Sequence, residues 1–477
     1  MKKTLLSMAV IGGLFSGAYA DDLSDLKSQI KSLTKKVKSL EKKQKRLKKS
    51  VAKVKAHDAF DNIKWDVDFR TSFDNLHYKT VSGETASNND LYTNRLWLGM
   101  GYQVTPEMIF KGQLSFNKAF GADGNVNPTQ KNPARGRGFD AFDWIVNESL
   151  TDDTLKVREA FWLWKPTIGG YSTSFSVGRR PATNGYLINL RDDDKAKSPQ
   201  GHIINMEFDG ASATLQLGNV LPGMYVKLCA GRGLTNANTK LDQAGFDYAT
   251  DGDDLDNTDL IGVLAKLYDD GQYGAMMTLF RAKSVPGYDA SSVTPVLKTL
   301  GDIDGAALSF KVQGIGDEIN DFLDDTIVFA SFAMSQTRPN GTRMLGTETT
   351  KSGYSYWLGA QVPNATGGKF GIEYNHGSEY WRPFTYGEDT MIGSKMAVRG
   401  NAYEAYWTQP IIQKDGKDVF SMQVRYTYLD YDYSGSNAFF GDAGAPISLD
   451  DSAALAKAQI DPVETAQDLR IYFRYRY

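Results

Sequence analysis

The acidic residues between positions 247 and 259 are the densest group of side chains that could bind a metal ion. Their carboxylate oxygens suit calcium, but the spacing lacks the register of an EF-hand and its terminal Glu, so a solvated loop is the simpler interpretation. One cysteine, Cys229, and four scattered histidines exclude a site of several thiolates and suggest no metal cluster. We therefore predict no metal and no cofactor.

Catalytic motifs are also missing from the sequence. It contains no HExxH, GxSxG, P-loop or CxxC pattern, and its paired carboxylates lie in loops without an assignable geometry. We therefore predict that the protein is not an enzyme.

Basic residues at alternate positions of strand-like segments offer a different chemistry, the selection of ions. These candidates for pore-lining residues are Lys64, Arg70, Arg95, Arg158, Lys311, Arg399, Arg425, Arg470 and Arg474. Rings of fixed charge select ions of opposite sign, and Asp66 and Asp68 are the opposing charges on the same faces. We expect a mildly anion-favouring lumen, with most acidic residues, Asp192 to Asp194 among them, in surface loops.

Strands with one apolar and one polar face are needed to position these cations. Residues 63–70 alternate in this way, and 419–428 place Ser421, Gln423, Arg425 and Thr427 on one face. Residues 469–477 alternate as well. Such strands are typical of a transmembrane antiparallel β-barrel, which must close because lipid offers the backbone no hydrogen bonds. A large soluble β-sandwich or propeller is the alternative fold.

The connections between these strands have two lengths. Short turns are predicted at 105–107, 166–170, 209–210, 269–271, 363–368 and 415–416, and long extracellular loops near 119–152, 181–201, 284–301, 337–352, 381–396 and 432–466. Both ends of the barrel belong on the periplasmic side, so the strand number is even, 16 to 18. The count depends on residues 221–223, which either interrupt one strand or adjoin a weak extra one, and we slightly favour 18.

Two further features concern the pore and the membrane interfaces. The 119–152 loop, with Arg135 and Arg137, is the best candidate for a loop that folds inward and constricts the pore; an exposed loop is equally compatible. Aromatic residues at strand ends should form the interfacial girdles of a membrane barrel, and these are Trp65, Tyr102, Trp162, Trp164, Trp357, Tyr406, Trp407, Tyr475 and Tyr477.

Two segments precede the barrel, which we place at 58–477. Residues 1–20 have the basic start, short apolar stretch and Ala-Tyr-Ala ending of a signal peptide. Residues 21–57 repeat apolar positions with the spacing of a coiled coil, and the predicted oligomerisation residues are Leu26, Ile30, Leu33, Val37, Leu40, Gln44, Leu47 and Val51. The coil is strongly basic, so a contact with peptidoglycan in the periplasm and a merely solvated helix surface are about equally plausible.

The C-terminal segment 468–477 resembles the last strand of Gram-negative outer-membrane proteins, in which a final aromatic residue is read by the barrel-insertion machinery. That residue is usually Phe and here is Tyr477. Together with the leader and the coil, the chain is similar to an uncharacterised family of porin-like proteins, and 178–181 and 205–210 also look like recurrent porin segments. The resemblance implies an outer-membrane location, contact with outer-membrane lipid and lipopolysaccharide, and a homotrimer.

We therefore expect an outer-membrane porin, a water-filled channel for small hydrophilic solutes or ions. The alternative is a structural protein that tethers the membrane to the cell wall through its cationic coil. A nucleic-acid partner is not expected.

Overall fold

The computed structural model describes residues 37, 63–122, 150, 153–237, 255–289, 296–316, 319–385, 390–438 and 440–477. The chain divides into two compact units, 1–62 and 63–477. In the first unit only Val37 is described, and it is helical. The signal peptide and the other predicted coil positions therefore lie outside the described residues and stay predictions.

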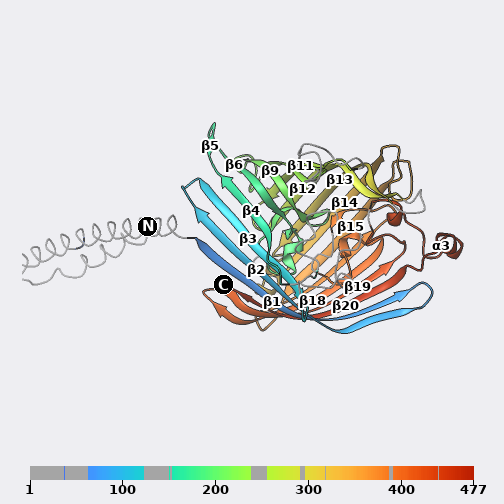
Figure 1. Ribbon diagram of the computed structural model, residues 1–477. Helices are drawn as coiled ribbons and strands as arrows, with labels where there is room; N and C mark the ends of the chain where they lie inside the picture. The colour runs from blue at the N-terminus through green and yellow to red at the C-terminus, as the bar shows by residue number, and fades with distance from the viewer. Residues whose placement is uncertain are drawn as a thin grey trace, which may run out of the picture. The chain divides into compact units, whose positions relative to one another are not determined.

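The unit 63–477 is an antiparallel β-barrel (Figure 1). Its main sheet has 18 strands, of which β5 (Thr167–Ile168) and β17 (Phe384–Thr385) are two-residue segments, so 16 strands form the wall. The wall strands are β1 (Lys64–Thr80), β2 (Thr85–Gln103), β3 (Met108–Ala119), β4 (Lys156–Trp164), β6 (Tyr171–Ala182), β9 (Ile204–Gln216), β10 (Tyr225–Leu234), β11 (Thr258–Asp269), β12 (Tyr273–Asp289), β13 (Val296–Gln313), β14 (Ile327–Pro339), β15 (Ser352–Pro363), β16 (Lys369–Gly377), β18 (Gly400–Lys414), β19 (Lys417–Tyr431) and β20 (Val463–Arg476).

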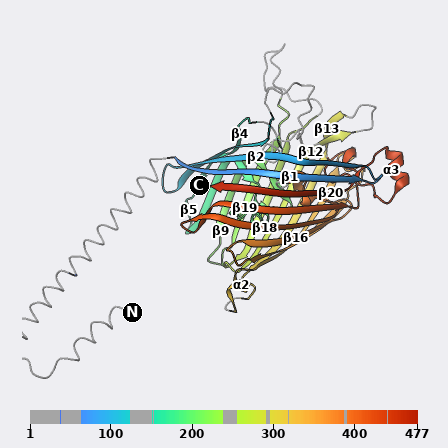
Figure 2. The ribbon, with the colours of Figure 1, turned by 90° about the horizontal axis from the view of Figure 1, so that it is seen from below.

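The barrel is closed by the first and last strands. Asp68 of β1 lies opposite Trp97 of β2 on one side and Arg476 of β20 on the other, and Figure 2 shows β1 beside β20 along the seam. The predicted barrel of 16–18 strands is confirmed, but the preference for 18 was wrong. Residues 221–223 lie in the turn that separates β9 from β10, so no extra strand forms there.

Most predicted turns are found where the sequence placed them, at one end of the barrel. The exception is Asp209-Gly210, which lies inside β9. A side chain on Gly210 would collide with the carbonyl oxygen of Ala230 and the backbone of Gly231 on β10. This glycine is therefore explained by the close approach of two strands, which a sequence pattern does not distinguish from a turn.

The connections at the other end are mostly long and contain short helices (Figure 1). The predicted loop at 284–301 is largely strand, because β12 and β13 extend to Asp289 and from Val296. In the described ranges these connections contain η2 (Ile188–Leu190), η3 (Lys395–Ala397), η4 (Asp442–Gly444) and α3 (Ser452–Ala458), whereas α2 (Asp321–Asp324) lies between β13 and β14 at the turn end.

Membrane-spanning helices are not found in the described ranges, where no helix has the length and apolar character to cross a bilayer.

Alternation along the strands separates an apolar outer face from an inner face with many polar groups. On β20, Arg470 and Arg474 are buried inside the barrel, whereas Leu469 and Phe473 are exposed outside. Among the predicted girdle aromatics, Trp65, Trp162, Trp164, Tyr475 and Tyr477 are exposed. Trp357 and Tyr406 are buried inside instead, because the strand register places them on the inner face.

Part of the interior is packed with apolar side chains. Strands β11 to β13 contribute Leu260, Phe280 and Ile303 to one cluster, which also contains Trp381 and Phe440 from the long connections. The barrel is therefore filled on this side, and the charged groups gather on the remaining wall and on the segment described next.

Candidate functional site: a loop folded into the barrel

The connection between β6 and β9, residues 183–203, lies inside the barrel, and we call it the inner loop. It contains β7 (Gly185–Tyr186), η2 and β8 (Lys197–Gln200), and β7 and β8 pair in parallel. Asn189 holds the turn between them, since its side chain accepts from the Leu187 N–H at 3.1 Å and donates to the Asp194 carbonyl at 2.8 Å. This loop therefore has a defined internal structure.

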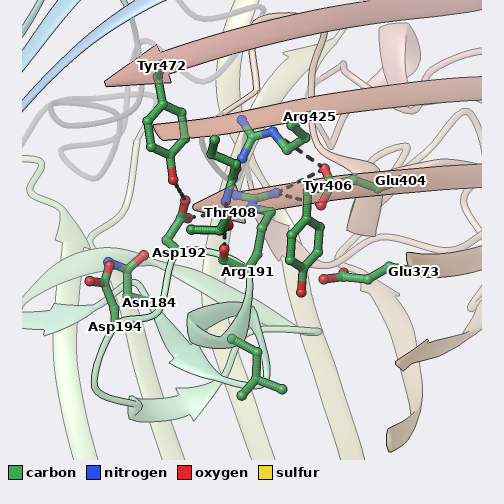
Figure 3. Close-up of polar contacts among 12 residues, drawn as sticks. Asn184, Arg191, Asp192, Asp194, Glu373, Glu404, Tyr406, Thr408, Arg425 and Tyr472 are labelled. Atoms are coloured by element: carbon green, nitrogen blue, oxygen red, sulfur yellow. Dashed lines mark hydrogen bonds and ion pairs between the residues drawn. The ribbon is translucent and has the colours of Figure 1, made fainter. Parts of the chain in front are cut away.

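The inner loop crosses to the opposite wall of the barrel through Arg191 (Figure 3). Nη1 of Arg191 donates to both carboxylate oxygens of Glu404 on β18, at 3.2 Å each. The carbonyl of Arg191 accepts from Gln423 on β19 at 2.8 Å, and that of Leu190 accepts from Gln361 on β15 at 3.0 Å. Three wall strands that are far from residue 191 in sequence thus hold this part of the loop.

The acidic residues of the inner loop contact strands β20 and β16. Arg474 donates to Asp194 and to the carbonyl of Asp192, both at 2.7 Å, and Tyr472 donates to Asp192 at 3.0 Å. Lys369 on β16 pairs with Asp193 at 2.6 Å. The expectation that Asp192 to Asp194 lie in a surface loop was wrong for Asp192, which is 7% exposed inside the barrel.

Burial and nearby charges perturb the carboxyl groups of this segment. Burial raises the pKa of Asp194 above its ordinary value, and the attraction of Arg474 does not fully offset this. Burial also acts to raise the pKa of Asp193, but the Lys369 ammonium and the arginines nearby outweigh it, so that this pKa is lowered. Asp193 is therefore ionised at neutral pH and binds its cationic partners.

Two further cationic and acidic groups extend the network around Glu404. Lys395, in η3, lies 2.6 Å from Glu404 and 2.5 Å from Glu373 of β16. Thr427 donates to Glu404 at 2.9 Å. Each buried carboxylate thus has a cation beside it, as burial of charge requires.

The end of the inner loop is fixed by neutral polar groups. His202 is fully buried and bonds Ser331 on β14 and Ser355 on β15, at 2.8 and 2.9 Å. Burial lowers the pKa of His202 to about 3, so its imidazole is neutral at physiological pH.

Six of the predicted basic residues lie on the inner face of the wall and are buried. They are Arg70, Arg95, Arg158, Arg425, Arg470 and Arg474. Acidic groups lie beside several of them: Arg158 is 3.2 Å from Glu207, and Arg470 pairs with Asp74. These carboxylates sit on strands and on the inner loop, so the cationic excess expected from alternation is largely neutralised.

The other three predicted residues differ from this group. Lys64 is exposed at the first position of β1. Lys311 is half-buried on the inner face of β13 and donates to Gln313. Arg399 precedes β18, is buried between the long connections and donates to the carbonyls of Trp381 and Ser434. Arg135 and Arg137 lie outside the described residues.

Sequence reasoning missed the inner loop as the segment that enters the barrel. One signal was present: residues 185–188 are Gly-Tyr-Leu-Ile, an apolar run that suits a buried position better than an exposed loop.

Metal sites do not appear in the described ranges, where no group of three His, Cys, Asp or Glu residues is placed to hold an ion.

The family model described as "Protein of unknown function (DUF3373)" matches residues 85–477, which covers all of the barrel except β1. The chain belongs to the DUF3373 family. No curated protein matches the chain.

Solved structures of outer-membrane proteins resemble this DUF3373 member at low identity. A Salmonella typhi OmpF complex with daunomycin is 13% identical, with a TM-score of 0.44, over 86% of this chain and 98% of the other. An anion-selective porin from Comamonas acidovorans is 10% identical, with a TM-score of 0.45, over 87% and 99%. Pseudomonas putida OprB is 10% identical, with a TM-score of 0.46, over 87% and 94%.

Proposed function

We propose that this protein is an outer-membrane channel for small hydrophilic solutes or ions, with a passage that the inner loop narrows. The observation that carries the proposal is the inner loop itself, bound by ion pairs across the interior of a closed 16-strand barrel. Barrels of this strand number are wide enough to hold an aqueous lumen. An anchor without a transport role has no need of so many charged side chains in its interior, because each is costly to bury.

A mild preference for anions follows from the balance of charge on the inner face. Most inner arginines are neutralised by Asp or Glu, as described above. Arg180 on β6, Lys227 on β10 and Lys311 on β13 make no ion pair with any residue that the structure describes. These three unneutralised cations support an anion-favouring interior.

The location and assembly belong to the same proposal. The apolar outer face of the barrel suits lipid, and the C-terminal strand carries the aromatic ending expected of a substrate of the barrel-insertion machinery. We infer that residues 1–20 direct export, that 21–57 form a coil joining three copies, and that this coil contacts peptidoglycan.

Single-channel recording of the purified mature protein in a planar bilayer tests the channel. We expect stepwise conductance and, in a salt gradient, a reversal potential displaced toward that of the anion. Lys311→Glu should move the reversal potential toward the equilibrium potential of the cation, because the substitution replaces an unneutralised positive charge with a negative one. A folded barrel that never conducts would overturn the proposal and favour the tether.

A further inference from the structure

A cavity lies inside the barrel between the inner loop and strands β6 and β9 to β12. About 60 Å³ of it admits the centre of a water-sized molecule, and part of it is continuous with solvent. Ser198 and Pro199 of β8 form one side, and inward-facing residues of the five strands form the others. A space of this size admits a few water molecules or one small ligand.

Two basic side chains line this cavity without a carboxylate partner. Arg180 donates to Ser176 and lies over the ring of Phe161, 4.6 Å from its centroid. Lys227 donates to Ser198 at 2.8 Å. Within the described ranges neither forms an ion pair, unlike the inner arginines of β4 and β20. Two neighbouring positive charges that form no ion pair repel each other in this partly buried position, and a bound anion would offset that repulsion.

A hydroxyl group in the same cavity also has no partner. Thr278 on β12 is fully buried, and its Oγ1 forms no hydrogen bond with any described residue. Buried polar atoms nearly always have a hydrogen-bond partner, so an unsatisfied hydroxyl in a cavity wall is independent evidence for a missing polar group.

The rest of the lining is mainly apolar. Ile204, Phe208, Leu260, Leu264 and Phe280 face the same space. An inorganic anion would satisfy the two cations but would leave these side chains against water. A ligand with a charged end and an apolar body would satisfy both parts of the cavity.

We propose that this cavity binds a small organic carboxylate, with the carboxylate between Arg180 and Lys227 and an apolar ring or branched chain against Phe208 and Phe280. The proposal goes beyond the channel function, because binding to the folded barrel does not require that the barrel conducts.

Calorimetric titration of the full mature chain in detergent with benzoate tests this site. We expect one benzoate per chain. Lys227→Met and Arg180→Met should each weaken binding by about tenfold or more, because each removes a charge-assisted hydrogen bond. Benzamide, which is neutral, and acetate, which has no ring, should also bind about tenfold more weakly. Lys266→Met is the matched control: Lys266 is on β11 beyond Leu264, pairs with Asp269 and does not line the cavity.

A second measurement uses the unaltered protein and so does not depend on whether the variants fold. Cys229, the one cysteine of the chain, lines the cavity. Benzoate should slow its reaction with a small thiol reagent, and benzamide should not. The proposal is overturned if benzoate neither binds nor protects Cys229, if Lys227→Met and Arg180→Met bind it as tightly as the wild type, or if acetate binds as tightly as benzoate.

Discussion

Replacing Arg191 with Met should release the inner loop from the wall of the barrel. The guanidinium and Glu404 are both almost fully buried, and Nη1 reaches both carboxylate oxygens. Breaking a buried ion pair costs about 3–5 kcal/mol. Glu404 keeps Lys395 and Thr427 as partners in the variant, so we expect the lower end of this range, about 3 kcal/mol, in the free energy of loop opening.

Limited proteolysis measures this opening directly. Lys195 lies in the inner loop and is a trypsin site that Arg191→Met leaves intact. When opening and closing are fast, the cleavage rate follows the population of the open loop, so a loss of about 3 kcal/mol raises it about a hundredfold. Peptide mapping after brief digestion of the folded protein gives the rate at Lys195.

The matched control is Arg232→Met, which removes an ion pair with Asp259 in which both side chains are largely exposed. Exposed pairs contribute about 0–1 kcal/mol, so cleavage at Lys195 should stay close to the wild-type rate. If Arg191→Met also leaves that rate within about twofold while the barrel remains folded, the ion pair does not hold the loop and the reasoning is refuted.

Two more predictions concern pH and assembly. The pKa of His202 is lowered to about 3 in the folded protein, against about 6.5 in the unfolded chain. The unfolded chain therefore binds the extra proton at mildly acidic pH. Consequently, the stability that depends on neutral His202 is lost as pH falls below 6.5. At pH 5 protonation of the unfolded chain lowers the free energy of unfolding by about 2 kcal/mol relative to pH 7.5. Urea unfolding of the wild type and of His202→Gln should show that difference only in the wild type. An equal pH dependence in the two proteins would contradict the prediction. Deleting residues 21–57 should convert trimers to monomers in sedimentation experiments while solute flux persists. Loss of envelope integrity with unchanged flux would favour the tether instead.

The closed antiparallel barrel could be predicted because a wall with an apolar outer face and a polar inner face requires a strict pattern. Residues 419–428 and 469–477 alternate, with Val419 and Tyr472 as the exceptions on their polar faces. Strands β19 and β20 bury the polar residues that this alternation placed inside, among them Arg425, Arg470 and Arg474. Alternation is local, so it can be read from the sequence of one strand. The strand number was less certain because residues 221–223 could interrupt one strand or adjoin a weak extra one, and only the closed sheet shows that they form the turn between β9 and β10.

The functional site depended on contacts that no local pattern contains. Arg191 and Glu404 are separated by 213 positions, and Arg474 and Asp194 by 280. Apart from the apolar run at 185–188, the composition of residues 183–203 does not indicate that the segment turns inward; the acidic run at 192–194 resembles an exposed loop. Its direction is decided by charged groups of three strands, Lys369 of β16, Glu404 of β18 and Arg474 of β20, which come together only when the barrel closes.

The sequence by itself therefore determined the class of fold, the outer and inner faces of the strands and the positions of most turns, because these follow from a period of two residues and from turn chemistry. Only the tertiary structure decided which loop enters the barrel, which cations are neutralised, and that Arg180, Lys227 and Thr278 meet at one cavity. Those outcomes depend on the pairing of charges across the interior, and a charge is neutralised by whichever residue the closed sheet brings beside it.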